Sequence, residues 1–178
     1  ERAGPHGLHN RGMLIAGIAL GLALGLLLGG RLENLANIRL RFLPLLFVAV
    51  IFRFAVEAAL NFGLPLAEAL RMPLLAFAYA LLLFVLWKNR WYPGLALAMV
   101  GIAANGLAIL ANGGRMPVWL PAYEMSGIQG PIDSVLHFEL TAEMGPEFLL
   151  GLGPLADIIP IPFWPVQNVA SLGDLFLT

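Results

Sequence analysis

Apolar residues along this chain gather in four long stretches, at about residues 13–30, 43–62, 73–87 and 95–111. Short segments that are basic, polar or rich in Pro and Gly separate them. An α-helix rises about 1.5 Å per residue, so each stretch spans about 22–30 Å, near the hydrocarbon thickness of a bilayer. Within lipid, a helix satisfies its own backbone hydrogen bonds. We therefore predict an all-α integral membrane protein with a bundle of four transmembrane helices.

The first stretch carries a glycine at every fourth position, and these residues are Gly17, Gly21, Gly25 and Gly29. Positions i and i+4 share one face of a helix, so the four glycines form a smooth strip. Small residues of this kind let another helix backbone approach closely within a membrane. We expect the strip to dock on a helix of a partner subunit or, alternatively, on this chain's fourth stretch, where Gly101, Ala104 and Ala108 are small.

Composition supports the membrane prediction and excludes several classes of function. Hydrophobic residues make up 60% of the 178 positions and charged residues only 12%, with a mean hydropathy of +0.84. The net charge is −1, and no Lys/Arg cluster suited to a phosphate backbone is present, so we expect no nucleic-acid partner. The chain has no cysteine, and its three histidines do not group with carboxylates at ligand spacing. We expect no metal and no cofactor.

The charges are distributed unevenly, and their distribution predicts a topology. Residues 31–41 and 88–90 are basic, whereas residues 116–178 contain no Lys or Arg. That last third instead holds seven acidic residues: Glu124, Asp133, Glu139, Glu143, Glu147, Asp157 and Asp174. Because Lys and Arg concentrate in cytoplasmic loops, we expect the two basic segments inside and the acidic third outside.

The chain therefore divides into three parts. Residues 1–12 form a polar N-terminal extension, residues 13–115 the transmembrane bundle, and residues 116–178 an acidic extracytoplasmic segment. We predict that this segment is an irregular, Pro/Gly-rich cap that leads into a partial fifth helix near Leu172–Thr178. Within the cap, Ser134–Met144 is expected to form a short helix. Asp157–Pro165, with three prolines, is expected to be extended.

Arg53 and Glu57 are the charges that lie well inside a predicted span. Four residues apart, they face the same side of a helix and can pair there. Charges at such depth are costly unless paired, and they often mark functional sites. The pair is therefore either a functional site or a structural one, the latter being an ion pair of the bundle or a contact of Arg53 with a partner subunit. The structural interpretation is favoured, because a single pair forms no relay across a membrane.

Candidate binding residues cluster around the acidic third: Asn112, Arg115, Asp157, Asn168 and Asp174. Asn112 belongs to an Asn-Gly-Gly run of the kind that ends helices, whereas Arg115 is able to hold a carboxylate or a lipid phosphate. Asp157 and Asp174, if close together, can share a proton and activate water. The alternative is that the residues from Asn168 to Asp174 cap the start of the next helix.

Four blocks carry a resemblance to a known family: GGRLENL (29–35), NGGRMPV (112–118), DIIP (157–160) and NVASLGD (168–174). In this order they resemble an uncharacterised family of small bacterial multi-helix membrane proteins, described only as a domain of unknown function. The resemblance implies a multi-pass protein of the bacterial cytoplasmic membrane and supplies no activity.

The segment from Asp157 to Ala170 is also similar to the late segment of lipoprotein signal peptidase, an aspartic membrane protease. Ser171 stands where that family has its catalytic aspartate, and Asp174 lies three residues later. The partner motif G-N-x-x-D-R has no counterpart in this chain, so the catalytic dyad is not matched.

The sequence favours a non-catalytic role, as an accessory or scaffold subunit that packs against other transmembrane helices in a membrane complex. Membrane lipids and other transmembrane subunits are the expected partners. The alternative is an enzyme or binder that acts on lipids or lipoproteins at the outer leaflet, using Arg115 with Asp157 and Asp174. A transporter is a third hypothesis, which the single intramembrane ion pair disfavours.

Overall fold

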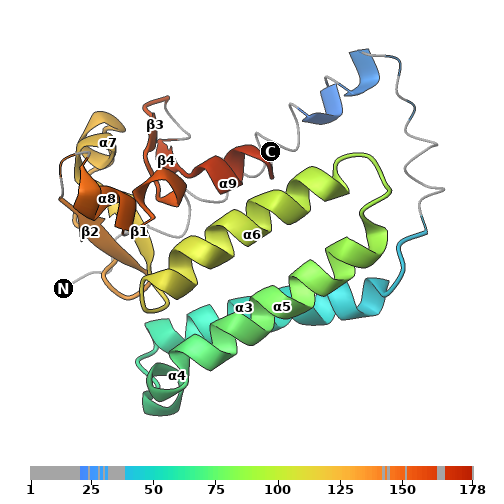
Figure 1. Cartoon of the computed structure of the whole chain (residues 1–178), viewed down its shortest axis with the longest axis horizontal. Helices are drawn as coiled ribbons and strands as arrows, with labels where there is room; N and C mark the ends of the chain where they lie inside the picture. The colour runs from blue at the N-terminus through green and yellow to red at the C-terminus, as the bar shows by residue number, and fades with distance from the viewer. Residues whose placement is uncertain are drawn as a thin grey trace.

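The computed structural model describes residues 21–23, 25–27, 29, 31, 39–141, 143, 145–150, 152–163 and 167–177. Most of these residues are helical, and three long helices follow one another: α3 (Leu43–Asn61), α5 (Arg71–Asn89) and α6 (Leu95–Ala111). A short helix, α4 (Pro65–Ala69), links the first two. In Figure 1 the long helices run side by side, and α5 packs against both α3 and α6.

The three long helices follow the predicted apolar stretches closely, and helix-breaking residues explain where they begin and end. Pro44 occupies the first turn of α3, a position in which its missing N–H costs no hydrogen bond. Gly94 precedes α6 at φ 81°, and Gly113 and Gly114 follow it at φ 65° and 82°. Only glycine adopts such angles without strain, so the Asn-Gly-Gly run ends α6 as expected.

Two of these helices, α3 and α5, are long and apolar enough to cross a membrane. The third, α6, is apolar but has 17 residues. Residues 21–23 and 25–27 are helical, which agrees with the first predicted stretch as far as it is described. The described residues thus contain two candidate membrane spans, and the bundle of four spans stays a prediction.

The acidic third is not wholly irregular, which corrects the all-α prediction. It contains two small sheets, in which β1 (Met116–Trp119) pairs parallel to β2 (His137–Leu140), and β3 (Ile159–Ile161) pairs antiparallel to β4 (Asn168–Ala170). Between and after them lie α7 (Leu120–Met125), α8 (Pro146–Leu150), the 3₁₀ turn η1 (Gly153–Leu155) and α9 (Leu172–Leu175). We call residues 116–171 the cap.

The predicted helix at Ser134–Met144 is wrong, because β2 occupies residues 137–140. Asp133 does not cap a helix there; its carboxylate accepts a hydrogen bond from the Val135 N–H at 2.9 Å and forms a turn. The extended character expected near Asp157 is present, since Asp157 bridges to Val118 and β3 follows. Asp157 thus adds a third short pairing beside β1.

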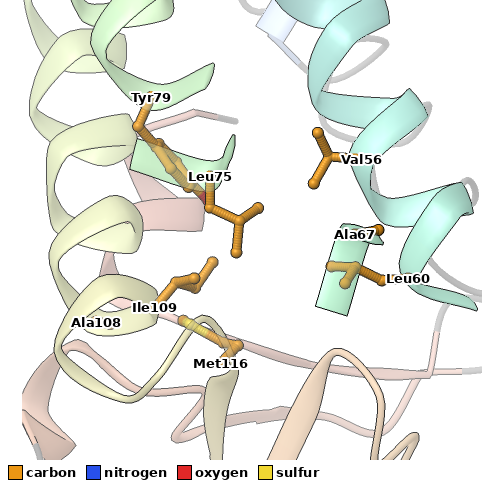
Figure 2. Close-up of a cluster of buried hydrophobic side chains, with 8 residues drawn as sticks. All are labelled: Val56, Leu60, Ala67, Leu75, Tyr79, Ala108, Ile109 and Met116. Carbon is orange, nitrogen blue, oxygen red and sulfur yellow. The ribbon is translucent and has the colours of Figure 1, made fainter. Parts of the chain in front are cut away.

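A hydrophobic core joins the helices to the cap. Its buried residues come from α3, α4, α5, α6 and β1, and they are Val56, Leu60, Ala67, Leu75, Tyr79, Ala108, Ile109 and Met116. Figure 2 shows them converging where the ends of the helices meet the start of the cap. A second, smaller core of Leu140, Phe148 and Ala156 lies within the cap itself.

The last helix, α9, lies along the middle of α6 rather than beyond the bundle (Figure 1). Gly173 on α9 and Gly101 on α6 face each other so closely that a Cβ on either would collide with the other's backbone carbonyl oxygen. Two glycines therefore allow the chain to return from the cap to the level of Asn105.

Candidate functional site

A cluster of polar side chains lies where α3, α5, α6 and α9 approach one another. Each helix contributes at least one member, and together they are Arg53, Glu57, Tyr79, Asn105, Ser171 and Asp174. Apolar residues surround it, including Leu75, Leu82 and Ile102. We call these six residues the polar cluster.

Arg53 and Glu57 form the ion pair that their spacing on α3 predicts. Their side chains are 18% and 26% exposed, so the pair is largely withdrawn from the surface. The Arg53 guanidinium also lies 5.4 Å from the centre of the Tyr79 ring on α5, within reach of a cation–π interaction. The ion pair thus connects α3 to α5 as well as stabilising its own helix.

Asn105 connects α6 to the start of α9. Its amide donates a hydrogen bond to the Asp174 carboxylate at 2.8 Å, and its side-chain oxygen accepts one from the Ser171 hydroxyl at 2.8 Å. Ser171 and Asp174 in turn form a capping box, in which each side chain bonds the other's backbone N–H at 3.0 Å. The capping interpretation is therefore confirmed for Ser171 and Asp174, whereas Asn168 belongs to β4. Asn105 adds a link that the sequence did not suggest.

Two cavities lie against the Arg53–Glu57 pair. The smaller, of about 140 Å³, extends toward the cap and reaches Met116 and His137. The larger, of about 240 Å³, is bounded by Tyr79, Asn105 and several apolar side chains. Arg53 and Glu57 line both, so the ion pair separates one space from the other.

A second buried cation, Arg71, fastens the cap to the bundle. Its guanidinium forms a forked pair with Glu68 at 2.9 Å and donates to the backbone oxygens of Val135 at 2.7 Å and Gly114 at 3.4 Å. Gly114 has no side chain, and a Cβ there would meet the Arg71 side chain at 2.7 Å. The glycine that ends α6 thus also makes room for Arg71.

Burial shifts the pKa values of three titratable groups in the described part of the cap, which are Tyr123, His137 and Asp157, and raises that of Tyr123. Burial raises the pKa of Asp157 well above its ordinary value, and the negative charge of Asp174 raises it further. Burial also lowers the pKa of His137, although the nearby Asp133 carboxylate opposes this. The carboxyl of Asp157 and the imidazole of His137 are therefore both favoured in their neutral forms.

The structure brings only part of the sequence-predicted site together. Asp157 and Asp174 lie within electrostatic reach of each other. Asn168 is the first residue of β4 and pairs with Ile161, at the end of the β3–β4 pair that is farther along the chain from Asp157. Asn112 ends α6, where its side chain donates to the Ala108 carbonyl at 2.7 Å. Arg115 is exposed, and among the described residues it forms no ion pair with either aspartate.

The glycine strip is described only in part. Gly17 lies outside the described residues, whereas Gly21 and Gly25 belong to helical turns. Positions Gly25 and Gly29 have no neighbouring atom within 4 Å of an added Cβ. The alternative docking surface within the chain was Gly101 with Ala104 and Ala108, and of these Gly101 is already covered by α9.

Sequence reasoning missed Tyr79, His137 and the role of Asn105. One signal was available for Asn105, which is an amide in the middle of an otherwise apolar helix. Such a residue needs a hydrogen-bond partner when buried, but the sequence does not indicate which one. Within the described part of the chain, no three His, Asp or Glu side chains gather as metal ligands.

Comparison with known proteins places the chain in a family without assigning an activity. An uncharacterized protein of Thermotoga maritima is 36% identical over 100 residues, which is 54% of this chain and 52% of the relative. This chain thus matches about half the length of that relative. No solved structure matches. Residues 37–178 match DUF5317, a family of unknown function, and the chain therefore belongs to that family.

Proposed function

We propose that this chain is a multi-pass protein of the bacterial cytoplasmic membrane that serves as a non-catalytic accessory or scaffold subunit of a larger membrane complex. The observation that carries the proposal is the exposed apolar surface of its long helices. Packing against membrane-embedded partners accounts for that surface and for the buried polar cluster together.

Membrane embedding is supported by α3, whose most apolar stretch has a mean hydropathy of 2.1 but is only 17% buried within the structure. The core helix of a water-soluble protein would be mostly buried. On α3, instead, Ile51 and Phe54 are 66% and 64% exposed. Large apolar side chains in such a continuous row favour a lipid or protein environment over water.

Charge supports the same orientation that the sequence predicts. At one end of the bundle, Lys88 and Arg90 lie over the rings of Trp87 and Trp91, at 4.4–5.1 Å from the ring centres. Basic and aromatic residues together are typical of the cytoplasmic membrane interface. The acidic cap lies at the opposite end, which favours a position outside the cytoplasm (Figure 1).

A non-catalytic role is supported by how the polar groups are used. The side chains of Ser171 and Asp174 both form hydrogen bonds with the Asn105 amide group. Each of the two side chains also accepts a hydrogen bond from the other residue's backbone N–H. Groups held in this way stabilise helix contacts. A catalytic group instead needs a free side facing a substrate.

The proposal that this membrane protein is a subunit of a complex is supported by the first predicted helix, residues 13–30, which carries the glycine strip. An added Cβ at Gly25 would meet no atom within 4 Å, and Gly101, the glycine of α6 that was expected as the alternative docking position, is covered by α9. This leaves the strip available to a helix of another protein.

Gentle detergent extraction from native membranes, followed by mass spectrometry of the bound proteins, tests this proposal. We expect membrane proteins to co-purify in fixed ratio, and Gly25→Leu to remove them. Ala23→Leu, on the opposite face of the same helix, is the matched control and should retain them. A protein that purifies alone, or losses that are equal for both variants, would contradict the subunit role.

One observation favours a second candidate, an outer-leaflet enzyme or binder. The pKa of Asp157 is raised first by burial and then by Asp174, so the two carboxyls are coupled as in an acid–base pair. In that case, cells lacking the protein would accumulate a lipid or lipoprotein form that the wild type removes and Asp157→Asn does not. Arg115→Gln would impair the same reaction.

A further inference from the structure

The larger cavity has a polar end and an apolar end. Arg53, Glu57, Tyr79 and Asn105 form the polar end, from three different helices. The apolar end includes Phe54 and Leu177, which are 64% and 45% exposed. A molecule in this cavity would therefore place a polar group against the ion pair and an apolar part against the outer surface of the helices.

The polar end presents a cation and an anion side by side. A guanidinium has five N–H donors, more than a single carboxylate oxygen satisfies, so Arg53 retains capacity to bind a phosphate. Glu57 is able to accept hydrogen bonds from an ammonium group. A purely anionic ligand would face the Glu57 carboxylate, and a purely cationic one would face Arg53. A zwitterion satisfies both.

The size of the cavity limits what it encloses. Pockets for drug-sized ligands usually measure roughly 300–1,000 Å³, whereas this one measures about 240 Å³. It therefore suits a compact polar group whose apolar part remains outside. The exposed Phe54 side chain lies where acyl chains would leave the cavity, on the apolar face of α3.

We propose that the cavity between Arg53, Glu57, Tyr79 and Asn105 binds the headgroup of an aminophospholipid. The phosphate lies toward Arg53 and the ammonium group toward Glu57, while the acyl chains stay in the bilayer. The inference rests on the proposed membrane embedding but does not depend on a partner subunit.

Native mass spectrometry of the purified full chain, released from vesicles of equal parts phosphatidylethanolamine, phosphatidylcholine and phosphatidylglycerol, tests this site. We expect at least about tenfold more phosphatidylethanolamine than either other lipid on the wild type, equivalent to about 1.4 kcal/mol of preference. Phosphatidylcholine is the sharpest comparison, because its quaternary amine has no hydrogen to donate to Glu57.

The test variant replaces both charges, Arg53→Met together with Glu57→Met. Replacing a buried ion pair by apolar side chains of similar size usually preserves folding, whereas removing one partner leaves an unpaired charge. We expect the double variant to enter vesicles and to lose the phosphatidylethanolamine preference. Arg39→Met with Glu124→Met removes one cation and one anion at exposed positions that do not line the cavity, and it should keep the preference.

Three results would overturn the proposal: equal retention of all three lipids, preference for phosphatidylglycerol, or an unchanged preference in the Arg53/Glu57 double variant. Retention of soluble glycerophosphoethanolamine in place of the lipid would also overturn it, because the acyl chains would then be irrelevant. Failure of the wild type to enter vesicles would instead contradict the proposed function.

Discussion

At the scale of single residues, polar side chains that lie among apolar ones form hydrogen bonds and ion pairs with one another. Asn105, Ser171 and Asp174 satisfy one another, and Arg53 is paired with Glu57. Asp157 differs from these, because it is 9% exposed and lies near another carboxyl. Its ionised form is therefore unfavourable in the folded protein, and this has a consequence for stability.

Asp157 should make the protein less stable as the pH rises. With its pKa raised in the folded state, the folded chain holds this proton where the unfolded chain has released it. Stability from this residue is complete below the unfolded value of 3.8 and is lost as the pH rises through the folded-state pKa. Thermal unfolding in detergent across this pH range should show the decline, and Asp157→Asn should remove it and raise the Tm at neutral pH.

Glu124→Gln is the control for this prediction, because Glu124 is an exposed carboxylate of the same cap. It should leave the pH dependence as it is. A Tm that falls in Asp157→Asn at neutral pH would show that the ionised carboxylate stabilises the fold, which is the opposite of what its burial predicts.

Gly173 should not tolerate a side chain. An added Cβ would collide with the Asn105 amide and with the Gly101 carbonyl oxygen at 2.7 Å. Gly173→Ala should therefore destabilise the protein by about 1–3 kcal/mol, the usual cost of overpacking. Gly145→Ala, whose nearest atom would lie at 3.7 Å, is the matched control. Equal Tm values for the two variants would mean that α9 does not pack closely on α6.

At the scale of elements, Arg71 is the main polar link between the helices and the cap. It is buried, and it joins the start of α5 to Glu68, Gly114 and Val135. Arg71→Gln should leave Glu68 without its partner and weaken both backbone contacts. Because leaving a buried carbonyl oxygen without its hydrogen-bond donor costs about 1–3 kcal/mol, we expect the cap to become sensitive to chymotrypsin while the helices stay protected.

Arg115→Gln is the control for Arg71→Gln, because Arg115 is an exposed arginine near the same junction. It should leave the rate of chymotrypsin cleavage unchanged. Cleavage at equal rates in the two variants would show that Arg71 does not hold the cap.

The long helices were predictable because their apolar stretches are continuous and their ends carry Pro and Gly. The fourth stretch, residues 95–111, coincides with α6. The strands were not predictable in the same way. β1 and β2 have four residues each and pair across an intervening helix, so neither carries enough local periodicity to identify it. The Ser134–Met144 prediction failed because this tertiary pairing overrides local helix preference.

In the candidate site, too, contacts between residues close in sequence were predictable, whereas contacts between distant residues were not. Arg53 and Glu57 are four residues apart, and their pairing follows from helix geometry alone. Asn105 and Asp174 are 69 residues apart, and only the fold brings them together. Arg115 was expected to hold a carboxylate or a lipid phosphate, but the arginine near the cap that pairs with a carboxylate among the described residues is Arg71.

At the scale of the whole molecule, charge and apolar surface are arranged along one axis. Lys88 and Arg90 lie at one end with their tryptophans, exposed apolar side chains cover α3 between the ends, and the acidic cap lies at the other end. This order is the one expected for a cytoplasmic interface, a hydrocarbon layer and an external face. It predicts that the basic end faces the cytoplasm and that the acidic cap lies outside.

Labelling of single cysteines with a membrane-impermeant maleimide in intact cells tests that orientation most directly, because the chain has no cysteine of its own. Ser134→Cys places a thiol on the cap, and Pro93→Cys places one at the basic end, both at exposed positions. We predict that Ser134→Cys is labelled in intact cells and Pro93→Cys only after the membrane is permeabilised. Labelling of both without permeabilisation, or of Pro93→Cys alone, would contradict the orientation.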